Sequence, residues 1–295
     1  MDPLDFLSGF DSWHIISEGM AKDEKYHCLK DGIAYLLRVA DGASYGQKQA
    51  EYAYLQLLNR ADLPVPECIS FTENNNGTKV LTLLSWIPGM EAEKLIPKLS
   101  HQEQYDLGLQ AGQILRRIHQ AVPVTDSCKD WYERYFEVID PRLDAYRKKG
   151  ILFDGSEEVL NFVDENRGLL QSRPLCHHHG DYHTGNLIIQ DGKLWVIDWH
   201  SVDFEGVGDP WYEFNRVDTR YPSFAKGQID GYFDNSIPHE FWKLFALYFA
   251  VSAITSIVWA KYRAPSALDW VMERNRDVLR IFDRMQDPVP IWYRK

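Results

Sequence analysis

One stretch of the sequence, from His179 to Trp199, has the residue types and spacing that phosphoryl transfer requires. It reads HGDYHTGNLIIQDGKLWVIDW. The carboxylate of Asp181 can accept the proton of a hydroxyl group as that hydroxyl attacks a phosphate. Magnesium prefers hard oxygen ligands and takes one or two carboxylates together with substrate phosphates. Asn186 and Asp198 supply such oxygens, so they are the expected Mg²⁺ ligands.

The two expected metal ligands should lie at the ends of a β-hairpin. Two apolar runs flank Asp191-Gly192, a pair that is typical of two-residue hairpin turns. Such a turn puts Asn186 opposite Ile197 and next to Asp198, on strands about 4.8 Å apart. Strict alternation points the two side chains to opposite faces of the hairpin. A shared metal ion therefore requires a distortion at the strand ends or a different register.

The elements before this hairpin predict a small β-rich part at the start of the chain. Apolar runs on both sides of Asp31-Gly32, and on both sides of 74–77, predict two further hairpins. Between them, the spacing of apolar residues predicts a helix over 47–59. Pro88-Gly89 ends this pattern, so the predicted first domain covers residues 1–89.

After residue 90 the pattern becomes helical. Apolar residues on one face predict a helix over 101–120, and 131–149 and 157–170 are further predicted helices. The stretch 241–260 is long enough to span a membrane, but it contains Lys243 and three hydroxyl residues, so we expect a buried helix. The whole pattern predicts an α+β protein whose second domain, 90–295, is mainly helical.

The segment that begins at His179 resembles the catalytic core of the aminoglycoside phosphotransferase and choline kinase family. The family pattern is HGDxxxxN, then a hairpin, then IDW or IDF, the counterpart of HRDxxxxN and DFG in protein kinases. Further stretches match in order: the connector 84–89, the helix end 114–119 and Gly208-Asp209-Pro210. The resemblance implies a two-lobed protein-kinase-like fold. Its small β-rich N-lobe would cover the nucleotide, and its large helical C-lobe would hold the catalytic loop and the substrate site.

The same resemblance implies the chemistry of the site. ATP or GTP is the expected phosphoryl donor, Mg²⁺ the cofactor and Asp181 the catalytic base. The connector is expected to bind adenine through Ser85 and Ile87, while His179 and Asp209 support the catalytic loop. The expected acceptor is a hydroxyl group of a small molecule such as an aminoglycoside antibiotic, which would make the protein an antibiotic-resistance enzyme.

The chain departs from this family at the phosphate-binding lysine. Such kinases have a lysine on the third strand that contacts the α- and β-phosphates and pairs with a helix glutamate. Here the position is Arg38, and Glu51 on the following helix is the expected partner. Arginine can bind phosphate through two nitrogens, but the exchange is not conservative. The first turn, 18–24, also lacks a GxGxxG pattern, and the absence of GxxxxGK[ST] argues against a P-loop enzyme.

The charge of the chain favours a positively charged partner. The net charge of −11 repels nucleic acid and anionic membranes and attracts cations. Together with the resemblance, this favours an amine-bearing acceptor and argues against nucleic-acid or membrane partners. The acidic residues expected to line the acceptor site are Asp203, Glu205, Glu213 and Asp218.

Other interpretations remain open. The chain could phosphorylate choline or an amino sugar, or it could be a catalytically silent kinase-like protein that binds nucleotide, because Arg38 replaces the usual lysine. Phosphorylation of a protein is less favoured, since no APE-type element or long activation segment follows Asp198. The sequence does not predict the oligomeric state.

Histidines and cysteines suggest no metal centre or disulfide framework. Zinc binding by the histidines of 177–183 is weakly supported, because no carboxylate or cysteine completes a recognisable ligand set. The four cysteines are widely spaced, which favours reduced thiols and a cytoplasmic protein. They are Cys28, Cys68, Cys128 and Cys176.

Overall fold

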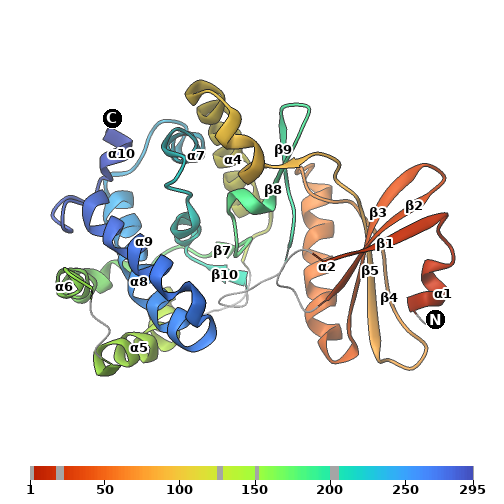
Figure 1. Ribbon diagram of the computed structural model, residues 1–295, viewed down its shortest axis with the longest axis horizontal. Helices are drawn as coiled ribbons and strands as arrows, with labels where there is room; N and C mark the ends of the chain where they lie inside the picture. The colour runs from red at the N-terminus through yellow and green to blue at the C-terminus, as the bar shows by residue number, and fades with distance from the viewer. Residues whose placement is uncertain (1–2, 18–22, 125–128, 150–152, 200–205, 295) are drawn as a thin grey trace. The chain divides into compact units, whose positions relative to one another are not determined.

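The computed structural model describes residues 3–17, 23–124, 129–149, 153–199 and 206–294. The chain forms two compact units (Figure 1). The first contains Met1–Lys98 and Thr184–Ser201, and the second contains Leu99–His183 and Val202–Lys295. The first unit thus extends past the predicted boundary at residue 89, and the hairpin expected in the second domain belongs to the first.

A five-stranded antiparallel sheet forms most of the first unit, in the order β1-β2-β3-β5-β4. The strands are β1 (Ser12–Ile16), β2 (Glu24–Lys30), β3 (Ile33–Asp41), β4 (Cys68–Glu73) and β5 (Lys79–Ser85). The predicted turn between β2 and β3 is confirmed: Asp31 and Gly32 both have positive φ, 53° and 76°, as a two-residue hairpin turn requires. The second predicted hairpin appears as β4 and β5.

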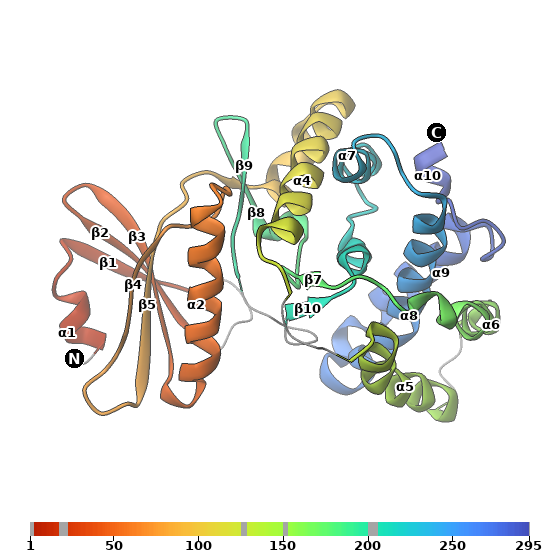
Figure 2. The same cartoon turned by 180° about the vertical axis from the view of Figure 1, so that it is seen from behind.

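The two faces of this sheet are covered by different helices (Figures 1 and 2). On one face, a core that includes Tyr26, Cys28, Leu37 and Val39 packs with Leu7 of α1 (Pro3–Leu7). The other face carries the residues that alternate with these along the strands, and α2 (Tyr45–Arg60) lies on that side. The predicted helix 47–59 falls within α2.

The catalytic-motif hairpin joins the first unit through strand pairing. Its strands β8 (Leu187–Gln190) and β9 (Lys193–Val196) turn at Asp191 and Gly192, both with positive φ. β6 (Met90–Glu91) pairs with β8. This ladder was not predicted from the sequence, and together with the hydrogen bond from the Val196 N–H to the Pro64 carbonyl at 2.9 Å it ties residues 184–201 to the first unit. The short helices η1 (Gly42–Ser44), α3 (Ala92–Leu95), η2 (Ile96–Lys98) and η4 (Thr184–Asn186) complete it.

The second unit is built around helices. In α4 (His101–Ala121), Ser100 and Glu103 form a capping box, which satisfies backbone donors that the first turn leaves free. The other elements are α5 (Trp131–Lys149), α6 (Ser156–Asn166), η3 (Arg167–Leu170), β7 (Cys176–His177), β10 (Val207–Gly208), η6 (Pro210–Arg216), α7 (Pro222–Phe233), α8 (His239–Arg263), η7 (Pro265–Ala267), α9 (Leu268–Ile281) and α10 (Ile291–Arg294).

Helices α4 and α7 touch through their backbones. A Cβ atom at Gly108 would lie 2.2 Å from the carbonyl oxygen of Phe224, and one at Gly112 would lie 2.1 Å from that of Gln228. On α7, Gly227 meets the α4 backbone in the same way. Only glycine permits so close an approach of two helix axes.

Helix α8 contains the long apolar stretch. Among the described helices it is the one with the length and hydropathy of a membrane span, but 72% of its apolar window is buried inside the structure. Its buried side chains include Phe241, Phe245 and Ile254. A helix that is apolar on all sides and buried is typical of a protein core, in line with the expectation for residues 241–260.

Candidate active site

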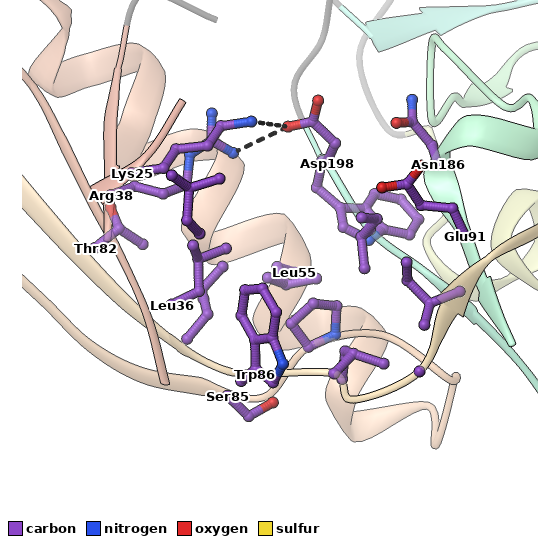
Figure 3. A pocket seen from close by; sticks show the side chains of 18 of the residues that line it. Lys25, Leu36, Arg38, Leu55, Thr82, Ser85, Trp86, Glu91, Asn186 and Asp198 are labelled. Atoms are coloured by element: carbon purple, nitrogen blue, oxygen red, sulfur yellow. Dashed lines mark ion pairs between the residues drawn. The ribbon is translucent and has the colours of Figure 1, made fainter. Parts of the chain in front are cut away.

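The first unit contains a pocket of about 580 Å³, every lining residue of which belongs to that unit (Figure 3). Ile16, Leu36 and Leu84 supply apolar wall from the sheet, and Leu55 supplies it from α2. Ile188 of β8 adds a further apolar side chain. A flat apolar group of the size of a nucleobase therefore finds hydrophobic contacts in it.

Positive side chains from β2, β3 and α2 line another part of the pocket. Lys25, Arg38 and Lys48 carry them, with side chains that are 16%, 9% and 11% exposed. Lys25 Nζ lies 3.7 Å from Asp198 Oδ1, and Arg38 Nη1 lies 3.6 Å from the same oxygen (Figure 3). The pocket thus brings the predicted phosphate-binding Arg38 to the predicted metal ligand Asp198.

The predicted pair between Arg38 and Glu51 is wrong. Glu51 Oε2 accepts a hydrogen bond from Lys48 Nζ at 3.0 Å, one helical turn earlier on α2. Arg38 Nη2 donates instead to Asp23 Oδ2 at 2.8 Å, and Lys48 Nζ lies 2.9 Å from that oxygen. Burial raises the pKa of Asp23, but the hydrogen bond from Lys48 and the charge of Arg38 outweigh it and leave this pKa below its ordinary value.

The connector after β5 offers backbone groups to the pocket. Ser85 Oγ accepts the N–H of Glu67 at 2.8 Å, and the Ser85 N–H donates to the Glu67 carbonyl at 2.9 Å, so the end of β5 is held in place. Ile87 lines the pocket two residues later. Its N–H has no hydrogen-bond partner in the described part of the chain, so this donor is available to a ligand.

The hairpin has the predicted register, and both of its ends depart from regular strand geometry. Leu187 pairs with Val196, and the Ile197 N–H donates to the Asn186 carbonyl at 3.0 Å. Asn186 ends the 3₁₀ helix η4, and Asp198 has φ = 60°, in the left-handed region. Both strand ends are thus distorted, as the prediction of a shared metal ion calls for, and both side chains line the pocket (Figure 3).

The oxygen donors of this site fit Mg²⁺. One carboxylate and one amide oxygen leave most of the coordination sphere to phosphates and water, as magnesium prefers. A cluster of three or more His, Cys, Asp or Glu side chains with metal-binding geometry does not occur among the described residues. The zinc interpretation of the histidines in 177–183 therefore has no support there.

Asp181 lies in the second unit, on the loop after β7. His183 Nε2 lies 3.2 Å from Asp181 Oδ2, and Arg216 Nε lies 3.7 Å from Oδ1. Burial raises the pKa of Asp181, but the hydrogen bond from His183 and the charge of Arg216 outweigh it and lower the pKa. The carboxylate is therefore ionised at neutral pH, the form that can accept a proton.

The loop before Asp181 is held by Glu213, and the predicted role of Glu213 in a substrate cleft is corrected. Glu213 is only 2% exposed. Its Oε1 accepts the N–H of Gly180 at 2.7 Å, and its Oε2 accepts the N–H of His179 at 2.9 Å and Nε2 of His119 at 3.0 Å. Burial raises the pKa of Glu213, but the hydrogen bond from His119 and the neighbouring imidazoles lower it to about 2.

Two further predicted residues support the same loop. The Asp181 N–H donates to His179 Nδ1 at 3.2 Å. Asp209 is fully buried, and its carboxylate accepts from Arg173 Nε at 2.9 Å and from Tyr248 Oη at 2.7 Å. Its carbonyl lies 2.9 Å from His178 Nε2, so Asp209 is tied to the strand that leads into the loop.

The remaining predicted acceptor residues are only partly described. Asp218 accepts hydrogen bonds from Arg220 Nε at 2.9 Å and Nη2 at 2.8 Å, so its carboxylate is paired with the guanidinium group of Arg220. Asp203 and Glu205 lie outside the described residues.

Comparison with known protein families matches residues 12–242 to the phosphotransferase enzyme family. The chain belongs to this family. The match covers the sheet, the pocket and the loop of Asp181, and it confirms the predicted recognition and the prediction of a small-molecule kinase. Comparison with individual curated proteins gives no significant match.

Solved phosphotransferases share the fold. A complex of aminoglycoside phosphotransferase APH(4)-Ia with ADP and hygromycin B has 17% identity and a TM-score of 0.65, and the alignment covers 94% of this chain and 96% of that one. ADP-bound APH(2'')-Ib has 17% identity and a TM-score of 0.65, with coverage of 94% and 98%. The gentamicin complex of APH(2'')-IIa has 18% identity and a TM-score of 0.65, with coverage of 94% and 93%. The predicted α+β, two-lobed kinase-like fold is confirmed.

Two pocket residues of this phosphotransferase, Lys25 and Lys48, were missed in the sequence, and so was Asp23, which contacts Arg38 and Lys48. Lys25 was detectable, because the two-residue turn at 31–32 sets a register that places it opposite Arg38. Lys48 was detectable too, since it lies three residues before Glu51 on one helix face. Asp23 carried no such signal, because its partners come from β3 and α2.

Proposed function

We propose that this phosphotransferase moves the γ-phosphate of ATP or GTP to a hydroxyl group of a small, amine-bearing molecule. The observation that carries the proposal is the pocket of the first unit. It combines an apolar wall, the open N–H of Ile87 and the cations around Asp198. A nucleoside triphosphate has the matching sequence of groups, from flat base to charged phosphates.

The donor would be held by residues of both the connector and the sheet. The backbone of Ser85 and Ile87 would bind the purine edge, between apolar side chains such as Leu36 and Ile188. Arg38 would bind the phosphates. Asn186 and Asp198 would hold Mg²⁺, which when bound neutralises phosphate charge and thereby favours transfer.

Asp181 would act as the base of the transfer step. Its ionised carboxylate accepts the proton of the acceptor hydroxyl while that oxygen forms a bond to the γ-phosphorus. The bond between the γ-phosphorus and the bridging oxygen breaks, and the nucleoside diphosphate leaves with the electron pair. His179 and Glu213 would keep the loop in the position that this step requires.

An amine-bearing acceptor is supported by the solved relatives and by the net charge. Two of the structures above contain hygromycin B and gentamicin, and the net charge of −11 attracts cations. Asp203 and Glu205 are the remaining acidic residues proposed to contact the acceptor. Choline and amino sugars, which are also hydroxylated cations, are the alternative acceptors and enter the same test.

The proposal is tested by nucleotide consumption with a panel of acceptors. Purified protein, Mg²⁺ and ATP or GTP are incubated with aminoglycosides, other amine-bearing antibiotics, choline and amino sugars, and separately with neutral and acidic sugars, and diphosphate release is measured. We expect turnover with at least one hydroxylated amine. Asp181→Asn should lower kcat by about 10²- to 10⁴-fold, while Asp144→Asn, whose side chain is 58% exposed on α5, should not.

Each outcome of this test separates the candidates. Nucleotide binding without transfer to any acceptor favours a silent nucleotide-binding protein. Turnover with a neutral or acidic acceptor alone contradicts the amine-bearing class. Unchanged turnover in Asp181→Asn removes Asp181 from the role of base.

A further inference from the structure

We propose that Lys25 on β2 binds the donor phosphates together with Arg38. Two cations from neighbouring strands would then carry the role for which related kinases use a single lysine on the third strand. The inference rests on the proposed use of the pocket for a nucleotide. It explains how a chain with arginine at the lysine position can still hold a triphosphate.

The sheet register places Lys25 beside Arg38 on the pocket face. Lys25 pairs with Arg38 across β2 and β3, and Arg38 pairs with Thr82 across β3 and β5. Directly paired residues of antiparallel strands point to the same face. The neighbours Tyr26 and Leu37 point to the opposite face, into the core with Leu7. Lys25 is therefore directed to the pocket by strand geometry.

Arg38 and Lys48 are already engaged by acidic neighbours. Arg38 and Lys48 both contact Asp23, at 2.8 and 2.9 Å, and Lys48 contacts Glu51 at 3.0 Å. Two cations and two carboxylates in this cluster balance one another. A triphosphate bound at Arg38 therefore needs additional positive charge, and Lys25, whose Nζ lies 3.7 Å from Asp198, is placed to provide it.

Lys25 is mostly buried and only loosely paired. Its side chain is 16% exposed, and within the described chain its ion-pair partner is Asp198, 3.7 Å away, beyond hydrogen-bond distance. A desolvated ammonium group normally has close acceptors. Arg38 is bound to Asp23 through Nη2, but its buried Nε has no hydrogen-bond partner. Lys25 Nζ and Arg38 Nη1 both lie near the carboxylate that would bind the metal–phosphate group, at 3.7 and 3.6 Å from Asp198 Oδ1 (Figure 3).

The decisive measurement is how the binding affinity depends on the number of phosphates in the ligand. Binding of adenosine, AMP, ADP and ATP with Mg²⁺ is measured by calorimetry for wild type and for Lys25→Met, which keeps an unbranched apolar side chain and removes the charge. A charge-assisted hydrogen bond contributes enough to change affinity by about 10- to 100-fold. We expect that loss for ATP and ADP, and an unchanged affinity for adenosine.

Matched variants separate phosphate binding from a structural effect. Lys30→Met removes an exposed lysine from the same strand and should bind all four ligands as wild type does. Lys25→Arg keeps the charge and should retain most of the ATP affinity. If Lys25→Met fails to fold, Lys25→Gln replaces it in the same comparison.

The outcomes distinguish this inference from the proposed function. Wild-type protein that binds no nucleotide contradicts the proposed function itself. Wild type that binds ATP, with a Lys25→Met variant that binds ATP equally well, overturns only the role of Lys25. A variant that loses adenosine and ATP affinity to the same degree shows a structural role and also overturns it.

Discussion

Replacing Glu213 with glutamine should weaken the second unit at neutral pH. The carboxylate accepts three hydrogen bonds, from the N–H groups of His179 and Gly180 and from His119, all in the interior. Glutamine has the same shape, but one of its two polar ends is an NH₂ group. That group faces donors where the carboxylate offered an acceptor, so at least one buried donor is left unsatisfied.

The magnitude follows from the pKa of Glu213. A lowering from 4.5 to about 2 corresponds to about 3 kcal/mol of stability that depends on the ionised form. Because the folded-state pKa lies below the unfolded value, this contribution is fully present above pH 4.5. It is lost as the pH falls from 4.5 toward 2.

Urea denaturation of wild type and Glu213→Gln across this pH range provides the assay. We expect the variant to be less stable by about 3 kcal/mol at neutral pH, and the difference to shrink as the pH falls and wild-type Glu213 becomes protonated. Glu165→Gln, at an exposed position on α6, is the control and should change stability by no more than about 0.5 kcal/mol. A difference that is absent at neutral pH, or that does not change with pH, would refute the reasoning.

Two further predictions concern packing and buried charge. Gly112→Ala should destabilise the protein by about 1–3 kcal/mol, because the added Cβ would lie 2.1 Å from the Gln228 carbonyl oxygen. The control Gly46→Ala adds its Cβ in open space and should change stability by less than about 1 kcal/mol. Equal thermal midpoints for the two variants would contradict this prediction. Asp209→Ala should lower the free energy of unfolding, measured by chemical denaturation, by about 3–5 kcal/mol, because Arg173 loses its carboxylate partner in a buried site. A decrease of less than about 1 kcal/mol would show that this pair behaves as a surface ion pair.

Local signals in the sequence predicted the hairpins and the register between Asn186 and Ile197. A two-residue Asp-Gly turn leaves little freedom in the register of the two strands, because both turn residues need positive φ and the turn then sets every residue pair that follows. The left-handed conformation of Asp198 was not predictable in the same way. Strand alternation predicts only that Asn186 and Asp198 point to opposite faces of the hairpin, and the left-handed backbone at Asp198 is imposed by the surrounding structure.

Long-range partners account for the wrong prediction for Glu213, and a local partner accounts for that for Glu51. The sequence predicts Glu213 as one of the acids that line the acceptor site, but its partners His119 and Gly180 lie 94 and 33 residues away in the chain. Glu51 was assigned to Arg38 by analogy, while Lys48 on the same helix is closer and competes for it. The burial of Glu213 depends on tertiary packing, which residue spacing does not report, whereas the spacing of Lys48 and Glu51 on one helix face could have revealed their pair.

The direct backbone contact between α4 and α7 has a mechanical consequence. Where side chains separate two helices, a substitution can be absorbed when neighbouring side chains change rotamer. Here the glycine positions leave no such layer, so added volume can only displace a whole helix. His119 sits on α4 and joins Tyr232 of α7 to Glu213. A methyl group added at Gly112, two turns before His119 on α4, would therefore shift the backbone beside Asp181. Turnover would then change although the substituted residue contacts no ligand.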